Sequence, residues 1–251
     1  MAGGRVLVTG MSGLIGGALR QRLEARMPLR ALNRRDIPGV ECRRGDIADL
    51  GAIEPAFEDI DVVVHLAAAA GGSVPWESIL QNNLVGTYNV LEASRRAGVR
   101  RVIFASSGAT VTGYEQDEPY ASLVAGKTAG LTSWPMLTEA APVRPAALYG
   151  VSKAYGEALG RQYADEHGLS VLCIRIGRVK AEDRPTTPRD FSVWLSQRDC
   201  VQIIERAMQA PPELRFGVFF ATSENRWSYR DLAHARQALG FQPQDRAEEH
   251  R

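Results

Sequence analysis

The chain is poor in features that would mark a secreted, membrane-spanning or nucleic-acid-binding protein. Only three cysteines occur among 251 residues; Cys42, Cys173 and Cys200 are widely spaced and form no CxxC pair, so we expect reduced thiols and no disulfide framework. We find no signal peptide and no apolar run long enough to cross a bilayer. The formal net charge of +1 gives no general attraction for nucleic acid or membranes. We therefore expect a cytoplasmic protein.

Apolar runs alternate with segments of helical spacing along the chain, a pattern typical of a parallel sheet flanked by helices. The expected strands are residues 6–8, 29–32, 62–66, 102–105 and 171–176. Helices are expected over residues 14–26 and 79–97, and Gly98 is the expected C-cap of the second.

These elements predict one α/β domain over residues 1–251, a Rossmann-like, doubly wound parallel sheet. Residues 1–176 mainly form a dinucleotide-binding core, and residues 177–251 mainly form a small C-terminal substrate lobe. Prolines break the second part into short pieces at 185, 188, 211 and 212, so we expect substrate specificity there. Residues 120–136 resemble an insertion, and their Gly, Ser and Thr content favours a mobile loop near the active site.

A glycine fingerprint, TGMSGLIG, occupies residues 9–16 between the first expected strand and helix. In that context Gly10 permits a tight turn, Gly13 lets the backbone approach a pyrophosphate, and Gly16 allows close helix-to-strand packing. The helix N-terminus would face the anion. A glycine-rich turn without a ligand is the alternative.

The residues after the second expected strand bear on the choice of cofactor. A carboxylate there normally binds the ribose of NAD, but this chain has Asn33, followed by Arg34 and Arg35. An amide does not repel a 2′-phosphate, and the guanidinium groups could bind one, which favours NADP over NAD. A solvated basic turn is the alternative, and Asp36 could still serve an NAD ribose. Asp46 and Ile47 have the form of an adenine contact.

The sequence YGVSK at residues 149–153 places Tyr149 and Lys153 on one face of a helix. An ammonium beside the phenol favours the phenolate, which makes Tyr149 a proton-transfer group near neutral pH. Lys153 can also hold the nicotinamide ribose. Ser107 follows an expected strand and can hydrogen-bond the same substrate oxygen; Ser106 is the alternative.

These motifs resemble the extended short-chain dehydrogenase/reductases, also called the NAD-dependent epimerase/dehydratase family. The similar segments are residues 9–16, HLAA at 65–68, NLVGT at 83–87, FASS at 104–107, YGVSK at 149–153 and RIG at 175–177. The resemblance implies hydride transfer between a sugar-like carbinol and the nicotinamide, with Tyr149 as acid/base. It also implies a homodimer formed through the helices of residues 79–97 and 149–163.

Fingerprint and resemblance together predict the site residues. The catalytic residues are Ser107, Tyr149 and Lys153, and no metal is expected. The cofactor contacts are Gly10, Ser12, Gly13, Leu14, Ile15, Gly16, Asn33, Arg34, Arg35, Asp46, Ile47, Leu66, Ala67, Ala68, Asn83, Ala105, Tyr149, Lys153 and Ile176. The substrate contacts are Ser73, Ser107, Gly108, Arg178 and Arg189.

Within the family, the short C-terminal part and the segment GVFFATSEN at 217–225 resemble uronate dehydrogenases, which oxidise hexuronic acids. The match makes Arg189 the candidate clamp for a substrate carboxylate. Two positions depart from the subgroup: Gly108 and Ala109 replace its Asn-His pair, and Arg178 replaces a serine. They imply a related but different small substrate, carboxylated or otherwise anionic, held by Arg178 or Arg189. Solvated surface arginines are the alternative.

The leading hypothesis is an NAD(P)-dependent oxidoreductase that acts on a small sugar-acid-like hydroxy or carbonyl compound. An epimerase or dehydratase that retains its cofactor, acting on a sugar or nucleotide sugar, is the second. A non-catalytic dinucleotide-binding protein is the third.

Overall fold

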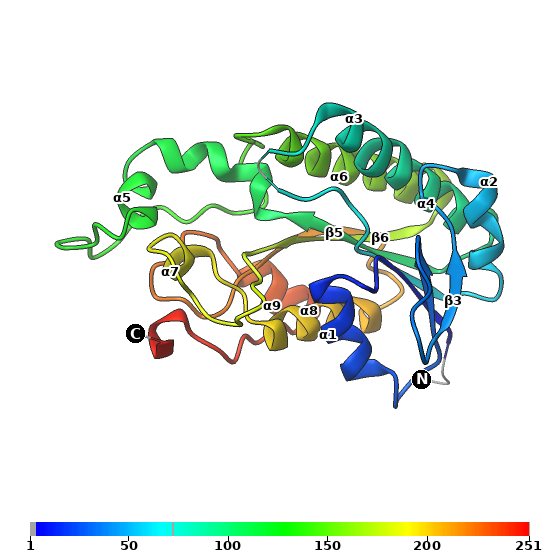
Figure 1. The fold of residues 1–251 in the computed structure, drawn as a ribbon. Coiled ribbons are helices and arrows are strands. Elements are labelled where there is room, and N and C mark those ends of the chain that lie inside the picture. Colours follow the sequence, from blue (N-terminus) through cyan, green and yellow to red (C-terminus); the bar gives the residue numbers. More distant parts are fainter. Residues whose placement is uncertain (1–3, 72, 251) are drawn as a thin grey trace.

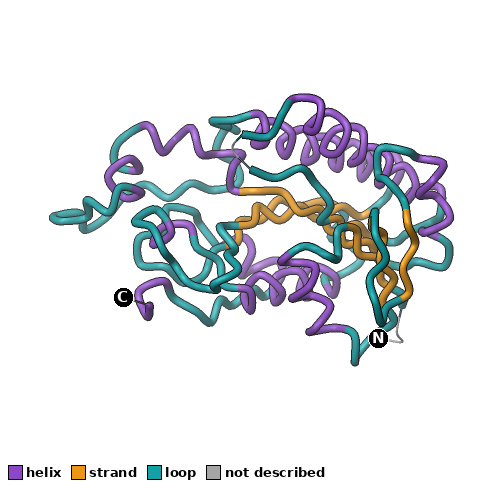
Figure 2. The backbone as a smooth tube through the Cα atoms, viewed as in Figure 1, coloured by secondary structure: helices purple, strands orange, loops and turns teal. Residues whose placement is uncertain are grey.

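Seven parallel strands form one sheet between two helical layers in the computed structural model, which describes residues 4–71 and 73–250 (Figures 1 and 2). The strand order is β3-β2-β1-β4-β5-β6-β7. The strands are β1 (Val6–Thr9), β2 (Leu29–Asn33), β3 (Glu41–Arg44), β4 (Val62–His65), β5 (Arg101–Ser107), β6 (Ser170–Ile176) and β7 (Phe216–Ala221). The order reverses direction between β1 and β4, which confirms the predicted doubly wound, Rossmann-like fold.

Helices cover both faces of the sheet (Figure 1). One layer contains α2 (Leu50–Ile53), α3 (Trp76–Ser78), the π-helix η2 (Ile79–Val85), α4 (Gly86–Arg96) and α6 (Leu148–His167). The opposite layer contains α1 (Leu14–Leu23), α8 (Gln197–Gln209) and α9 (Ala233–Leu239). The short elements are α5 (Tyr120–Val124), α7 (Asp190–Val193) and the 3-10 helices η1 (Glu54–Phe57), η3 (Gly108–Gln116) and η4 (Ala247–His250).

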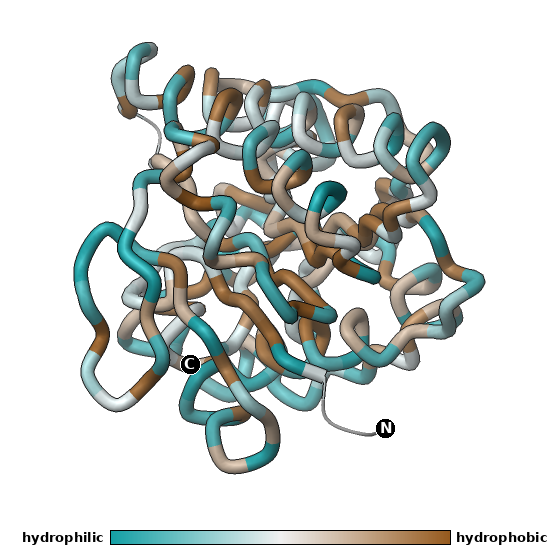
Figure 3. The backbone as a smooth tube through the Cα atoms, turned by 90° about the vertical axis from the view of Figure 1, so that its right-hand side faces the viewer, coloured by the Kyte–Doolittle hydropathy of each residue, from teal (hydrophilic) through white to brown (hydrophobic). Residues whose placement is uncertain are grey.

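The central strands are apolar because both of their faces are covered. Every residue of β1, β2, β4 and β6 is buried, and the hydrophobic residues gather on the strands between the helical layers (Figure 3). The edge strand β3 was not predicted, because its sequence ECRR is polar and mostly exposed and it pairs only with β2. Its position extends the sheet beside the tip of β2.

Glycines end two of the predicted helices in the left-handed conformation that favours this residue. Gly98 follows α4 with a φ of +70°, and Gly168 follows α6 with a φ of +67°. The helix predicted over residues 79–97 begins as a π-helix and continues as α4. The helix predicted to end at Arg26 ends at Leu23.

The C-terminal part contributes to the core as well as to the lobe. Strand β7 pairs with β6, and Glu205 of α8 forms ion pairs with Arg22 of α1 (3.1 Å) and with Arg26 just beyond it (2.5 Å). Within the described residues, no helix is long and apolar enough to span a membrane.

Residues 120–136, for which a mobile loop was predicted, form α5 and a loop that packs against residues 227–228. Trp134 stacks near Trp227, with ring centroids 5.6 Å apart, and donates a hydrogen bond to the Ser228 carbonyl (2.9 Å). The chain then pairs Leu137 with Arg230 in an isolated parallel bridge. The segment therefore supports the loop that carries Arg230.

Candidate active site

A cavity of about 810 Å³ opens at the carboxyl ends of the strands, where an open α/β sheet binds its ligands. The predicted residues that line it are Gly10, Gly13, Leu14, Ile15, Gly16, Leu66, Ala68, Ala105, Ser107, Gly108, Tyr149, Lys153, Ile176, Arg178 and Arg189. The predicted residues outside its lining are Ser12, Asn33, Arg34, Arg35, Asp46, Ile47, Ala67, Ser73 and Asn83.

Two glycines at the turn between β1 and α1 have no room for a side chain. Gly10 has a φ of +70°, and a Cβ there would lie 2.9 Å from backbone atoms of Ala67. A Cβ on Gly16 would lie 2.5 Å from the Cα of Met11. The role predicted for Gly16 is therefore corrected: it packs against the turn, not against a strand. The turn and the N-terminus of α1 form a cradle that fits the pyrophosphate of a dinucleotide.

A buried network holds residues 66–69 beside this turn. The Thr9 hydroxyl lies 2.8 Å from His65 Nδ1 and accepts hydrogen bonds from the backbone N–H groups of Leu66 (3.2 Å) and Ala67 (3.1 Å). Burial is the main cause that lowers the pKa of His65 to about 3, so its imidazole is neutral. The HLAA segment is thereby fixed to the end of β1.

Asn83 acts on the backbone of the same segment. Its Oδ1 accepts a hydrogen bond from Ala69 N (2.7 Å), and its Nδ2 donates to Ala69 O (3.0 Å) and Ser152 Oγ (2.9 Å). Asn83 is buried and does not line the cavity. Asn83 was predicted to contact the cofactor directly. In the structure it instead links Ala69 to Ser152 of α6, which lies between Tyr149 and Lys153.

Ser107, Tyr149 and Lys153 meet in the cavity, from the end of β5 and the first turns of α6. Burial raises the pKa of Tyr149, and a hydrogen bond with the Ser107 hydroxyl opposes that rise. The Lys153 ammonium lies 5.6 Å from the centroid of the Tyr149 ring. Burial also lowers the pKa of Lys153 to about 8. The three groups therefore surround one point where a substrate oxygen could accept or release a proton.

The structure separates the two serines that the sequence left as alternatives. The Ser106 hydroxyl donates a 2.5 Å hydrogen bond to Glu157, whose carboxylate also pairs bidentately with Arg175 (2.9 and 2.8 Å). All three side chains are buried. The Ser106 hydroxyl is thus used in a hydrogen bond to the buried Glu157–Arg175 ion pair, and Ser107 is the serine that interacts with Tyr149.

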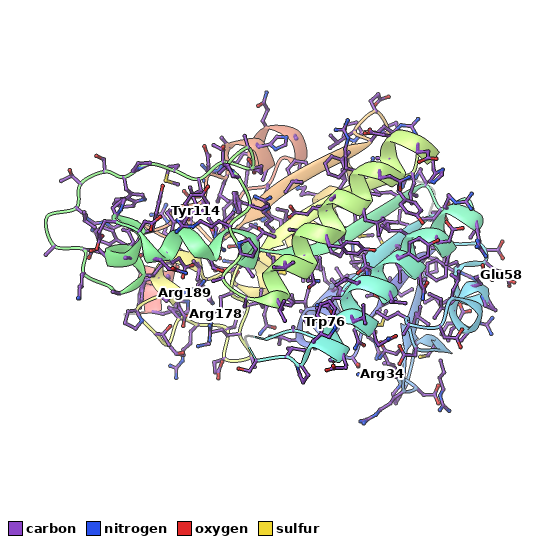
Figure 4. The ribbon with its side chains drawn as sticks, turned by 90° about the horizontal axis from the view of Figure 1, so that it is seen from above. Arg34, Glu58, Trp76, Tyr114, Arg178 and Arg189 are labelled. Atoms are coloured by element: carbon purple, nitrogen blue, oxygen red, sulfur yellow. The ribbon has the colours of Figure 1, made fainter. Side chains whose placement is uncertain are left out.

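The predicted 2′-phosphate site lies at the tip of β2, well apart from Arg178 and Arg189 (Figure 4). Asn33 is buried, and its Oδ1 has no hydrogen-bond partner among the described residues. This orphaned acceptor fits a ligand that supplies a donor, such as a ribose hydroxyl. Arg34 and Arg35 are exposed.

The remaining predicted residues near this end have local partners. Asp46 is exposed, and its Oδ1 accepts a hydrogen bond from Ala48 N (3.0 Å). Ile47 is buried and packs closely against Gly86; a Cβ added to residue 86 would lie 2.5 Å from Ile47 Cδ1. Ser73, a predicted substrate contact, is exposed and lies outside the cavity lining.

Both predicted substrate arginines are already paired. Arg189 binds Glu115 bidentately (2.6 and 2.7 Å), so the face of its guanidinium that would clamp a carboxylate is occupied. Arg178 pairs with Asp190 at 3.1 Å, and half of its side chain is exposed. Both arginines line the cavity, and Arg178 is also exposed to solvent.

Sequence reasoning missed Arg230, which is buried, lines the cavity and lies beside Gly108. Its loop carries no recognisable motif, and 122 residues separate the two positions. The only local signal was the glycine at 108, which removes a side chain next to Ser107.

Comparison with known proteins agrees with this geometry. The family model described as "NAD dependent epimerase/dehydratase family" matches residues 6–194. The chain is 34% identical to an L-arabinose 1-dehydrogenase (NAD(P)(+)) of Haloferax volcanii, over 96% of each chain. It is 36% identical to a uronate dehydrogenase of Agrobacterium fabrum, over 97% of this chain and 86% of the relative.

A solved structure shares the whole fold. The uronate dehydrogenase from Agrobacterium tumefaciens superimposes with a TM-score of 0.83 at 35% identity, and the match covers 99% of this chain and 87% of that one. The predicted family, fold and NAD(P)-dependent enzyme class are confirmed by these likenesses. The chain belongs to the NAD-dependent epimerase/dehydratase family and is an oxidoreductase of the extended short-chain dehydrogenase/reductase type.

Proposed function

We propose that this enzyme oxidises or reduces a small sugar-acid-like substrate, with Tyr149 as the acid/base. The observation that carries the proposal is the meeting of Ser107, Tyr149 and Lys153 in one cavity beside the glycine turn. The substrate class is supported by relatives named for uronate and L-arabinose. The cavity of about 810 Å³ suits a sugar-sized substrate together with the nicotinamide end of the cofactor.

In the oxidation, the residues handle the proton and orient the substrate. Ser107 holds the substrate hydroxyl, and Tyr149 Oη accepts its proton as the C–O bond becomes a carbonyl. The charge of Lys153 favours the phenolate form that starts this step. A bound NAD(P) would supply the oxidant for this step, by taking up the hydride from the same carbon. In the reverse direction Tyr149 donates the proton to the carbonyl oxygen.

The glycine turn and α1 would hold the pyrophosphate, and Lys153 the nicotinamide ribose. At the other end, Arg34 and Arg35 favour NADP because a 2′-phosphate would meet two guanidinium groups. Neither guanidinium has an ion-pair or hydrogen-bond partner among the described residues, which leaves both available.

Replacing Arg34 and Arg35 together by Ser should raise the KM for NADP by about 10- to 100-fold, because charge-assisted hydrogen bonds to the phosphate are lost. The KM for NAD should change by less than about threefold. Steady-state kinetics with each dinucleotide measures both values. Arg43→Ser, a change on the exposed side of β3, is the control. An unchanged KM for NADP would show that these arginines do not bind the 2′-phosphate.

The function itself is tested by following absorbance at the nicotinamide band with NAD and NADP against a panel of sugar acids, aldoses and simple ketones. We expect cofactor reduction with at least one sugar acid. Substrate conversion without net absorbance change would indicate an epimerase instead. Failure to bind either dinucleotide would contradict the proposal as a whole.

A homodimer is proposed through α4 and α6. Large apolar side chains are exposed on this layer: Trp76, Tyr88, Leu148 and Val151. They lie on α3, α4 and α6, which form one face of the molecule (Figure 1). Light scattering on the purified protein, with Val151→Glu for comparison, distinguishes a dimer from a monomer.

A cytoplasmic location is also proposed. Support comes from Cys42, Cys173 and Cys200, all of which are free thiols. Fractionation of cells that produce the protein would test it.

A further inference from the structure

Arg230 is a buried arginine at the substrate end of the cavity. It is 2% exposed and lines the cavity wall. Its backbone is fixed by the strand-like pairing of its loop with Leu137, through hydrogen bonds from Leu137 N to Tyr229 O (2.7 Å) and from Asp231 N to Leu137 O (2.9 Å). The guanidinium is therefore held in place by the fold.

The hydrogen bonds of this guanidinium are few and long. Nη2 donates to Gly108 O and to the Tyr229 hydroxyl, each at 3.4 Å. Nε is buried and has no partner among the described residues. No carboxylate in the described part of the chain forms an ion pair with Arg230. A buried arginine normally has such a partner, because an uncompensated buried charge is costly.

Three neighbouring cations of the cavity, Arg178, Lys180 and Arg189, already have a carboxylate partner. Asp190 pairs with both Arg178 (3.1 Å) and Lys180 (3.2 Å). Burial raises the pKa of Glu115, but hydrogen bonds from Arg189 and Tyr229 and the charges of Arg189 and Arg230 lower it overall. Both Glu115 oxygens, however, are bonded to Arg189, and one also accepts the Tyr229 hydroxyl at 2.5 Å. Among the arginines that line the cavity in the described part of the chain, Arg230 is the one without an ion pair to a carboxylate.

Gly108 makes room for this guanidinium next to the catalytic serine. A Cβ at position 108 would lie 2.2 Å from Arg230 Nη1 and 2.3 Å from its Cζ. Any side chain at 108 would therefore displace the guanidinium. Because Gly108 has no side chain, the positively charged guanidinium of Arg230 can lie beside Ser107.

We propose that Arg230 binds an anionic group of the substrate, a carboxylate or a phosphate, and so makes this enzyme selective for sugar anions over neutral sugars. The proposal rests on the function proposed above and deepens it. Nη1 is unbonded and Nη2 makes only two 3.4 Å hydrogen bonds, so the edge formed by these two nitrogens can meet the two oxygens of either group. A bound anion would supply the counter-charge that the described residues do not.

The test compares three substrates with the same anomeric carbon: D-glucuronate, D-glucose 6-phosphate and D-glucose. The parent should prefer one of the two anions, and the preferred one identifies the group. Arg230→Met should raise the KM for that anion by about 100-fold, because truncation of a buried charge partner removes its binding. The kcat/KM for D-glucose and the affinity for the dinucleotide should change by less than about threefold. Arg230→Lys should recover part of the loss.

Two further variants separate a binding role from a structural one. Gly108→Ala should weaken binding of the same anion, because the Cβ of the new alanine would occupy the position of the Arg230 guanidinium. Arg226→Met changes an exposed arginine of the same loop, which stacks on Trp227, and should leave the anion preference unchanged. Equal losses for the anion and for D-glucose in Arg230→Met would overturn the proposal. A parent that does not discriminate between D-glucose and the anions would overturn it as well.

Calorimetry on the dinucleotide-saturated protein distinguishes failure of this inference from failure of the proposed function. If no sugar is oxidised, binding of D-glucuronate or D-glucose 6-phosphate to the parent but not to Arg230→Met still supports the anion site. If sugars are oxidised but the variant binds both anions as well as the parent does, or if the parent binds neither, the anion site is overturned.

Discussion

Tyr149→Phe is expected to lower kcat/KM by about 100- to 10,000-fold, because it removes the hydroxyl that transfers the proton. The aromatic ring remains, so the cavity beside Ser107 and Lys153 keeps its shape. Dinucleotide affinity should therefore change little, since the glycine turn is untouched. Steady-state kinetics and a separate titration with the dinucleotide measure the two effects independently.

Tyr155→Phe is the matched control for this change. Tyr155 lies on the same helix but outside the cavity lining, so its loss of a hydroxyl should leave kcat/KM within about threefold of the parent. If Tyr149→Phe were as active as Tyr155→Phe, Tyr149 would not be the acid/base.

Lys153→Met is expected to move activity and stability in opposite directions. The kcat/KM should fall by about 100-fold or more, because the charge that favours the phenolate is lost. The unliganded protein should become more stable at pH 7. Lys153 is 3% exposed, and burial lowers its pKa from 10.5 to about 8. That difference corresponds to about 3 kcal/mol of cost for keeping the charge buried.

The pH dependence of the stability difference follows from the sign of this shift. Between about pH 8 and 10.5 the unfolded parent binds the Lys153 proton and the folded parent does not, so the stability of the parent rises with pH. The advantage of Lys153→Met should be full below pH 8 and should vanish near pH 10.5. Denaturant unfolding at pH 7 and pH 10 measures it, with exposed Lys127→Met as the control. A variant less stable than the parent by the same amount at both pH values would contradict this expectation.

Much of the fold could be predicted because it depends on local patterns. Apolar runs revealed five of the strands, each buried on both faces. The strands β3 and β7 were not among the predicted ones. Strand β3 was missed because an exposed edge strand such as ECRR needs no apolar residues. The glycine fingerprint correctly placed a tight turn between β1 and α1. The packing partner of Gly16 depends on how that turn folds back, and the sequence did not reveal it.

The substrate end was less predictable, because its charges are set by partners far along the chain. Arg189 has the residue type of a carboxylate clamp, yet Glu115, 74 residues away, occupies its bidentate face. Arg230 has no local motif, yet it is buried in the cavity wall without an ion pair to any carboxylate of the described residues. Its significance depends on Gly108, whose missing side chain leaves room for it.

The sequence by itself determined the family, the doubly wound sheet and the pairing of Tyr149 with Lys153 on one helix face. Each follows from residues that are close in sequence, where strand and helix geometry relate spacing to position. Only the tertiary structure decided which serine faces Tyr149 and which arginine is free to meet a substrate. Both outcomes depend on buried charged groups. The ion-pair partners of these groups lie far apart in the sequence and meet only in the folded structure.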